Sequence, residues 1–247
     1  MGSNMPKQKV IHLKWVAFAS LLNNTGAAFI WPLTTMYVNK YLHQTLTTAG
    51  VVMLFISIAM MAGNYLGGWL FDHWSPYKSA VLGVACSTLA IASLIVWHGW
   101  PWFAVLLVIN SFGDGINMTI INSYGTGVAN HTSRFVFNYI YMAFNVGVVI
   151  GTLLVGILLP ISVVLVFTVA TVFYMALSVV VIGTFNAPLA RRPQNQSRHS
   201  KVRLKGQPLL QLVYLILLNV ITIHISYSLW ESVLAVHMTN MGIPFYD

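Results

Sequence analysis

The segment Gly67–Lys78, GGWLFDHWSPYK, lies between two long apolar stretches and holds an acid, a histidine, a Ser-Pro turn and a lysine. Acids are rare in this chain, because only Asp72, Asp114, Glu231 and Asp247 are Asp or Glu. A charged segment so isolated in an apolar chain is expected where a membrane meets water. Its flanks therefore predict two membrane-spanning helices that this segment connects.

Composition places the rest of the chain in a membrane as well. Of the 247 residues, 57% are hydrophobic and 6% are charged, whereas average proteins carry about 25% charged residues. The one cysteine, Cys86, lies inside an apolar stretch, so neither a disulfide framework nor a metal site is expected. The chain is therefore predicted to be an all-α membrane protein.

Seven stretches are apolar enough to cross a bilayer, which takes about 20 residues. They cover residues 15–38, 47–71, 79–97, 102–124, 135–159, 161–185 and 208–236. A polar, basic stretch separates the sixth from the seventh. We expect a six-span N-terminal bundle over residues 1–190, a basic cytoplasmic linker over 191–207, and a seventh span over 208–247 that begins an incomplete second bundle.

Lys and Arg gather at one end of these spans. Eleven of the twelve basic residues flank that end, and only Lys40 lies at the other. The positive-inside rule makes the basic side the cytoplasm. We therefore expect a multi-pass protein of the cell membrane with a cytoplasmic N-terminus. The net charge of +8 then reflects topology and contact with the lipid bilayer, and no nucleic-acid partner is expected.

The connecting segment resembles a signature of the major facilitator superfamily. Gly68-x-x-x-Asp72, followed by a turn and Lys78, is similar to the loop between spans 2 and 3 of this family. Three positions depart from the family pattern, namely His73, Ser75 and Pro76. The resemblance implies that Asp72 helps to hold the cytoplasmic side closed. It marks Gly68, Asp72, Lys78 and Arg134 as candidates for the gating loop.

The fifth and seventh spans extend the resemblance. Arg134 precedes a fifth span rich in small and amide residues: Asn138, Asn145, Gly147, Gly151 and Gly156. Drug exporters of the family have a Gly-Pro pair in this span, whereas here Thr152 follows Gly151. The seventh span, with Glu231, is similar to that of some bacterial multidrug–proton antiporters.

This resemblance implies a secondary active transporter that exports hydrophobic or cationic small molecules in exchange for protons. Such transporters consist of two six-span bundles around a midplane site. The chain is thus expected to be a truncated protein or fragment that lacks the second half and does not transport alone. No enzymatic activity is expected, because phosphate-loop, metal-site and nucleophile motifs are absent from the sequence. The coupling ion is expected to be H⁺, with no cofactor.

Polar residues inside the fourth span are the first site candidates. Asn110, Asp114 and Asn117 follow i, i+4, i+7 spacing, so they share one helical face. A charge within the bilayer costs about 2.5–3.5 kcal/mol, which favours a function for it. We expect this face to line a cavity, where Asp114 could bind a cation or carry a proton. The alternative is a structural contact with span 1 through Asn23 or Asn24.

Two further spans carry polar candidates. His224, Ser228 and Glu231 have the same spacing in span 7 and could relay protons. The simpler interpretation is that Glu231 reaches interfacial water and that His224 is a hydrogen-bonded interior histidine. Asn138 and Asn145 share a face of span 5, where amides more often join helices than contact substrate. Five rings could stack on a flat or cationic substrate: Trp31, Tyr37, Tyr65, Tyr139 and Tyr141.

Three other functions stay open at this point. The first is uptake of a sugar or another metabolite, because a cavity with few acids also suits neutral substrates. The second is a seven-span receptor or photoreceptor. The basic-residue distribution opposes it, because such proteins place the N-terminus outside, and span 7 lacks the lysine that binds retinal. The third is a membrane scaffold that does not transport.

Overall fold

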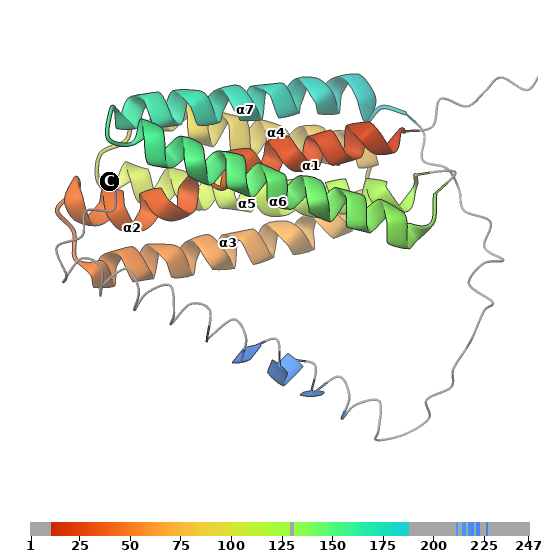
Figure 1. Cartoon of the computed structure of the whole chain (residues 1–247), viewed down its shortest axis with the longest axis horizontal. Coiled ribbons are helices and arrows are strands. Elements are labelled where there is room, and N and C mark those ends of the chain that lie inside the picture. Colours follow the sequence, from red (N-terminus) through yellow and green to blue (C-terminus); the bar gives the residue numbers. More distant parts are fainter. Residues whose placement is uncertain are drawn as a thin grey trace, which may run out of the picture. The chain divides into compact units, whose positions relative to one another are not determined.

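The structure, a computed structural model, describes residues 11–128 and 131–187, with single positions 211, 214, 215, 217–219, 221, 222 and 226. The chain divides into two compact units, Met1–Arg191 and Arg192–Asp247, and the description below concerns the first. Its described residues form helices and no strands: α1 (Leu13–Ala27), α2 (Ile30–Lys40), α3 (Leu46–His73), α4 (Pro76–Leu94), α5 (Trp102–Thr126), α6 (Ser133–Leu158) and α7 (Val163–Thr184) (Figure 1).

Helices α3 to α7 are long and apolar enough to cross a membrane. They match the second to sixth predicted spans to within a few residues at each end. The all-α membrane fold is therefore confirmed. The seventh predicted span, 208–236, lies mostly outside the described residues, and the linker over 191–207 lies wholly outside them, so both stay predictions.

The first predicted span, 15–38, is wrong as a single helix. Helix α1 ends at Ala27, a turn follows at Ala28 and Phe29, and α2 begins at Ile30. Pro32 explains the break, because it has no backbone N–H to donate to the carbonyl oxygen four residues earlier, at Ala28. The two helices are 15 and 11 residues long. Neither α1 nor α2 alone is long enough to cross a bilayer, but the two together have the length of one span.

Glycines set the closest helix contacts. A Cβ at Gly63 of α3 would overlap the carbonyl oxygen of Phe112, and one at Gly115 of α5 would overlap that of Met60. Helices α3 and α5 therefore approach at backbone distance, which small residues at a membrane helix interface allow. A Cβ at Gly68 would lie 3.8 Å from the Thr119 methyl carbon, an ordinary contact, so this approach does not require a glycine there.

Within the segment Gly67–Lys78, a short turn connects α3 to α4. Helix α3 ends at His73, Trp74 caps it, and α4 begins at Pro76 after Ser75. Proline suits the first position of a helix, because its fixed φ is helical and no partner exists there for an N–H. The departure from the family pattern at Pro76 thus serves to start a helix.

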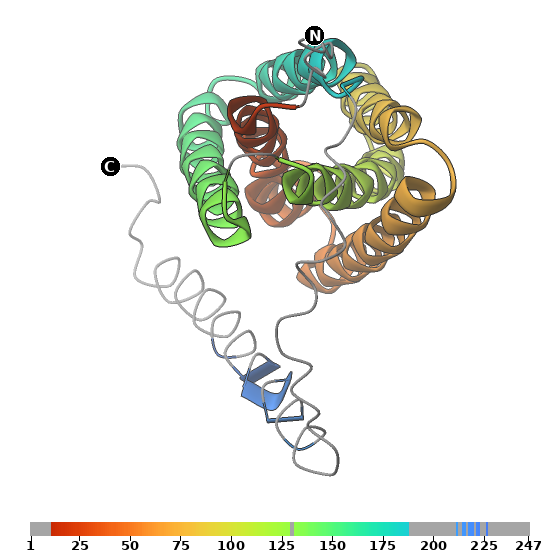
Figure 2. The same cartoon turned by 90° about the vertical axis from the view of Figure 1, so that its right-hand side faces the viewer.

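Helix α5 lies among the others in the end-on view of Figure 2. It packs against α3, α4, α1 and α6, while α7 packs against α4 and α1. Two different sides of α5 therefore face two different sets of neighbours. One set consists of α4, with α7 packed against α4, and the other consists of α1 and α6. Helix α5 carries polar residues on both of these sides.

Candidate functional site

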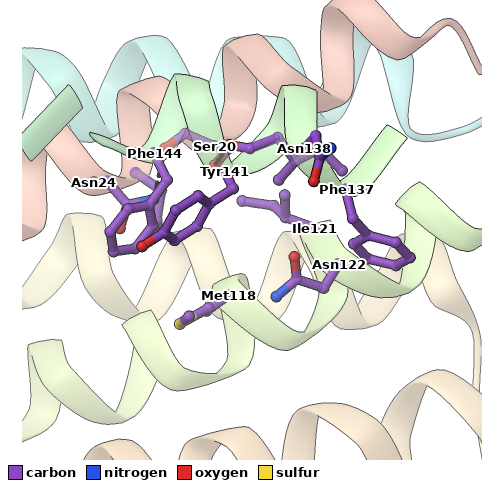
Figure 3. Close-up of a pocket in the computed structure, with 11 residues that line it drawn as sticks. Ser20, Asn24, Met118, Ile121, Asn122, Phe137, Asn138, Tyr141 and Phe144 are labelled. Carbon is purple, nitrogen blue, oxygen red and sulfur yellow. Dashed lines mark hydrogen bonds between the residues drawn. The ribbon is translucent and has the colours of Figure 1, made fainter. Parts of the chain in front are cut away.

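A cavity of about 390 Å³ lies between α1, α5 and α6 (Figure 3). Its volume falls within the range of about 300–1,000 Å³ of small-molecule sites. It is lined by Ser20, Asn23, Asn24, Met118, Ile121, Asn122, Phe137, Asn138, Ile140, Tyr141 and Phe144. We call it the amide cavity, since four of these residues are asparagines. None of these described lining residues is an acid or a strong base.

Each helix presents one face to the amide cavity. Helix α1 contributes Ser20, Asn23 and Asn24, and α5 contributes Met118, Ile121 and Asn122, both with i, i+3, i+4 spacing. Helix α6 contributes residues between 137 and 144. This spacing puts side chains on one stripe of a helix. The cavity therefore follows from three helix faces that share a small space.

The amides in the cavity differ in how far their hydrogen bonds are satisfied. Ser20 Oγ donates to the carbonyl oxygen of Ile140 at 3.3 Å, which links α1 to α6. Asn24 Nδ2 donates to the carbonyl oxygen of Ser20 at 2.7 Å. Asn23 is only 2% exposed, and its Oδ1 has no hydrogen-bond partner. Asn23 therefore lines the cavity and has a buried amide oxygen without a partner.

Aromatic rings line the α6 side of the amide cavity. Tyr141 and Phe144 stack with ring centroids 5.8 Å apart and an interplanar angle of 11°. In Figure 3 this pair lies at one end, Phe137 lies at the other, and Asn122 and Asn138 lie between them. Flat apolar surfaces thus alternate with amides along the cavity, an arrangement that suits a ring-containing ligand with polar substituents.

Asp114 lies elsewhere, and the expectation that its face lines a cavity is corrected. Asp114 is 2% exposed and is not among the residues that line the amide cavity. Its Oδ1 and Oδ2 accept from the hydroxyl of Tyr174 at 2.8 and 2.9 Å. Asn110 Nδ2 donates to Oδ2 at 3.0 Å, and Ser87 Oγ donates to Oδ1 at 3.3 Å.

These residues and Asn117 form what we call the Asp114 cluster: Ser87, Asn110, Asp114, Asn117 and Tyr174. Asn117 Nδ2 donates to Ser87 Oγ at 3.1 Å, so the three polar residues of the α5 face all belong to one network. The network joins α4, α5 and α7, whereas the sequence pointed to Asn23 or Asn24 of span 1. A buried carboxylate is stabilised by several donors, so the cluster acts as an interhelical contact in this conformation.

Tyr174 also connects the cluster to α1. Its hydroxyl reaches Asp114, and a Cβ on Gly26 would lie 2.7 Å from its ring. Gly26 lies one residue before the end of α1, where the first span breaks. Tyr174 therefore contacts both the only acid within α5 and the segment next to the break. Sequence reasoning missed both Ser87 and Tyr174, because their distance along the chain from Asp114 leaves no local pattern.

The gating-loop candidates lie at the surface of the described part of the chain. Asp72 and Arg134 are exposed, and neither makes an ion pair or hydrogen bond with another described residue. Lys78 Nζ lies 5.7 Å from the centre of the Trp74 ring. No contact among the described residues joins Asp72 to Lys78 or Arg134. Their gating role stays a prediction.

The remaining candidates divide between the cavity and other places. Asn138 lines the amide cavity, whereas Asn145 is exposed and donates to the carbonyl oxygen of Tyr141 on its own helix at 2.7 Å. Of the four described rings named from sequence, Tyr37, Tyr65, Tyr139 and Tyr141, only Tyr141 lines the cavity. His224 and Glu231 lie outside the described residues, and so does the side chain of Trp31.

Sequence reasoning also missed several cavity residues. Asn122, Phe137 and Phe144 were not singled out, although Phe137, Tyr141 and Phe144 follow i, i+4, i+7 spacing on α6. Aromatic residues at this spacing are common on lipid-facing helices, so the pattern was visible but not decisive. Within the described ranges, no three His, Cys, Asp or Glu residues lie close enough to hold a metal ion.

Comparisons with known proteins agree with this architecture. The sequence pattern of the Major Facilitator Superfamily matches residues 16–246. The MFS-type transporter YttB of Bacillus subtilis (strain 168), itself described as uncharacterized, is 32% identical over 237 residues, which are 94% of this chain and 58% of that protein. The chain thus spans little more than half the length of this relative.

Solved structures show the same fold at low identity. A peptide transporter, POT, in complex with sulfate superposes with a TM-score of 0.65 at 17% identity over 84% of this chain and 46% of that one. PepTSo, a POT family transporter, gives a TM-score of 0.58 at 15% identity over 86% and 46%. Neither the family match nor these similar proteins favour the alternative of a seven-span receptor. With a family match over nearly its whole length, this multi-pass membrane chain belongs to the major facilitator superfamily.

Proposed function

We propose that this chain is part of a secondary active transporter that exports small hydrophobic or cationic compounds in exchange for protons. The observation that carries the proposal is the amide cavity, with rings and amides around about 390 Å³. A space of this size can hold a small molecule with aromatic or aliphatic groups. Membership of a transporter family supports the transport step itself.

The position of the cavity supports export. Its residues begin about 10 Å along α1 from Leu13, about 6 Å before the end of α5 and about 6 Å after the start of α6, at 1.5 Å per residue. All three helix ends lie on the side that the basic residues predict to be cytoplasmic. A cavity at this depth is near the side from which an exporter collects its substrate, and the efflux measurement below distinguishes export from uptake, in which the substrate is released on that side.

Proton coupling rests on the acids within the membrane. The sequence has no nucleotide-binding motif, so an ion gradient would have to supply the energy. Asp114 is the buried acid of the described helices, and its network spans α4, α5 and α7. A proton on Asp114 would occupy one acceptor oxygen and weaken the contacts with Tyr174 and Ser87. Protonation could thus change how these helices pack.

Efflux of a fluorescent cation tests the proposal. The complete gene product is expressed in bacteria that lack their major drug exporters, and ethidium accumulation is measured with and without an uncoupler. We expect lower accumulation in expressing cells and loss of the difference when the uncoupler is added. Equal accumulation of ethidium and of uncharged dyes in expressing and empty cells would refute export. Uptake of a labelled sugar in the same cells would replace it with the uptake alternative.

A further inference from the structure

We propose that Tyr174 couples the protonation of Asp114 to the shape of the amide cavity. The proposal rests on the proposed function, because it concerns how the cavity exchanges its substrate for a proton. It goes further by naming the residue that transmits the change and the helix that responds to it. Three observations carry it: the donor balance of the Asp114 cluster, the contact of Tyr174 with Gly26, and the position of Gly26 in α1.

The Asp114 cluster is short of hydrogen-bond donors. The carboxylate accepts from Tyr174, Asn110 and Ser87, and no described cation pairs with it. The amide oxygens of Asn110 and Asn117 are buried and have no partner. A proton from water that binds to Asp114 would neutralise a buried charge and add a donor to this network. The network therefore has a use for a proton.

Tyr174 makes the contact that a proton would disturb most. Its hydroxyl lies 2.8 and 2.9 Å from the two carboxylate oxygens of Asp114, whereas Asn110 and Ser87 each reach only one of them. A proton on either oxygen would therefore change at least one of the two contacts of Tyr174. A neutral carboxyl group is also a weaker acceptor than a carboxylate. Protonation of Asp114 would thus loosen the hold on the Tyr174 hydroxyl.

The ring of Tyr174 lies against the backbone at the end of α1. A Cβ at Gly26 would lie 2.7 Å from Cε2, 3.0 Å from Cζ and 3.1 Å from Cδ2 of this ring. Since Cζ carries the hydroxyl, the part of the ring that contacts Gly26 is next to the group that binds Asp114. Close-packed groups transmit small displacements to their neighbours. A ring that moves at its hydroxyl would therefore shift relative to the last turn of α1.

This last turn of α1 also belongs to the wall of the amide cavity. Asn23 and Asn24 line the cavity and directly precede Thr25 and Gly26. On its other side the turn meets α6, because a Cβ at Gly151 would lie 2.5 Å from the carbonyl oxygen of Thr25. The helix breaks one residue after Gly26, so no helical continuation holds this turn in place. A shift of the turn would change the distance between the α1 and α6 sides of the cavity.

Few other titratable groups lie near Asp114. Tyr174 is the titratable residue of α7, and Cys86 of α4 lies close enough to the carboxylate to interact with it electrostatically. Tyr77 and Lys78 lie in the first turn of α4. The titratable residues of α1, α3 and α6 are exposed: Lys14, Tyr65, Asp72, His73, Arg134, Tyr139 and Tyr141. Asp114 is buried, so Cys86 is the group that an experiment must control for.

Ethidium is the probe for this coupling. Its affinity for the complete, detergent-purified protein is measured by fluorescence anisotropy at about pH 5.5 and about pH 8, because coupled sites change each other's affinity. We expect about tenfold weaker binding at the lower pH, within the range of about 5- to 150-fold for such couplings. Exchange of a substrate for a proton requires this sign, since the proton must displace the substrate.

Three substitutions identify the residue that transmits the change. Tyr174→Phe keeps the acid but removes the hydroxyl, so the ratio of the two affinities should fall below about twofold. Direct attraction of the cation by Asp114 would survive this change, and a tyrosine that only stabilises the fold would leave the ratio intact. Asp114→Asn should bind ethidium weakly at both pH values, because an amide is uncharged. Cys86→Ser is the control and should keep the tenfold ratio.

Backbone hydrogen exchange over residues 20–30 reports on the end of α1 without a ligand. It is measured by mass spectrometry at the same two pH values and corrected for the intrinsic exchange rate. Exchange should be about fivefold faster at the lower pH in the unchanged protein and in Cys86→Ser, and independent of pH in Tyr174→Phe. If Tyr174→Phe fails to fold, the unchanged protein and Asp114→Asn still decide, since only the former should respond to pH.

The outcomes separate this proposal from the proposed function. Ethidium affinity that is independent of pH in the unchanged protein overturns the proposal even if ethidium is exported. A tenfold ratio that survives in folded Tyr174→Phe also overturns it, because the coupling would then bypass the hydroxyl. If exchange at the end of α1 depends on pH through Tyr174, but ethidium is neither bound nor exported, the coupling stands and the proposed export is wrong.

Discussion

Helix α5 contributes polar side chains both to the Asp114 cluster and to the amide cavity, on two different sides. In the cluster, the carboxylate of Asp114 accepts hydrogen bonds from three side chains on three helices. In the cavity, Asn23 keeps a buried oxygen without a partner, and Asn138 is exposed. The amide oxygens of Asn110 and Asn117 in the cluster also have no partner, so the two regions differ in the space beside their polar side chains and not in unpaired oxygens alone.

The largest effect is expected for Asp114→Ala, which removes the centre of the cluster. Tyr174, Ser87 and Asn110 would each lose an acceptor in a buried place, so the free energy of unfolding should fall by about 2–3 kcal/mol. Unfolding of the purified protein in an SDS titration measures this change. The exposed acid offers a control, because Asp72→Ala should alter stability by less than about 0.5 kcal/mol. Equal effects of the two changes would show that the cluster does not hold its helices together.

On the cavity side, the next effect is expected for Gly147→Ala in α6. A Cβ at this position would lie 2.5 Å from the carbonyl oxygen of Leu21 in α1, so the two helices must move apart. Overpacking of this kind costs about 1–3 kcal/mol, and the wider contact should also weaken binding in the cavity. The SDS titration and a probe titration measure the two effects. Gly156→Ala on the same helix meets no atom within 4 Å and should be neutral or slightly stabilising, and a loss there would contradict the steric account.

A smaller effect is expected for Tyr174→Phe, which removes only the hydroxyl. The ring contact with Gly26 persists, while Asp114 loses one donor, so stability should fall by about 1–2 kcal/mol. The same unfolding titration measures it. Tyr139→Phe removes a hydroxyl from a side chain that is 39% exposed and should change stability by less than about 0.5 kcal/mol. If Tyr174→Phe and Asp114→Ala lower stability equally, the tyrosine is the main partner of the acid.

The smallest effect on stability is expected for Asn138→Leu in the cavity wall. Its amide is exposed, so unfolding should change by less than about 0.5 kcal/mol, whereas probe affinity should fall about three- to tenfold. Asn145→Leu should change neither quantity, because its amide is bonded to its own helix outside the cavity. If Asn138→Leu lowers stability but leaves probe affinity unchanged, Asn138 stabilises the helix packing, as the Asp114 cluster does, and does not bind the ligand.

Helix positions were largely predictable, and helix rotations were not. The apolar lengths of α3 to α7 are properties of each segment, so the spans could be located from hydropathy. The break between α1 and α2 had a signal in Pro32 that the length criterion alone does not use. The shared face of Asn110, Asp114 and Asn117 was also predictable from spacing. Its direction, toward α4 and α7, was not.

The candidate site was predictable only in part, for the same reason. Asn138 and Tyr141 were named from sequence and line the cavity, whereas Asn145 lies on the same face as Asn138, two turns further along α6, and does not. The choice between the two asparagines depends on how far along α6 the space between α1, α5 and α6 extends. That choice follows from close contacts such as Gly147 against the backbone of Leu21 and Thr25, which involve residues far apart in the chain.

By itself, the sequence determined the membrane class, the place of most helices and the predicted side of each loop. Bilayer thickness and the cost of buried charge act on one segment at a time, so local composition carries this information. Only the tertiary structure decided that Asp114 belongs to a closed cluster and Asn23 to an open cavity. The partners of Asp114 include Tyr174, 60 residues away, and such a meeting depends on how whole helices rotate and pack.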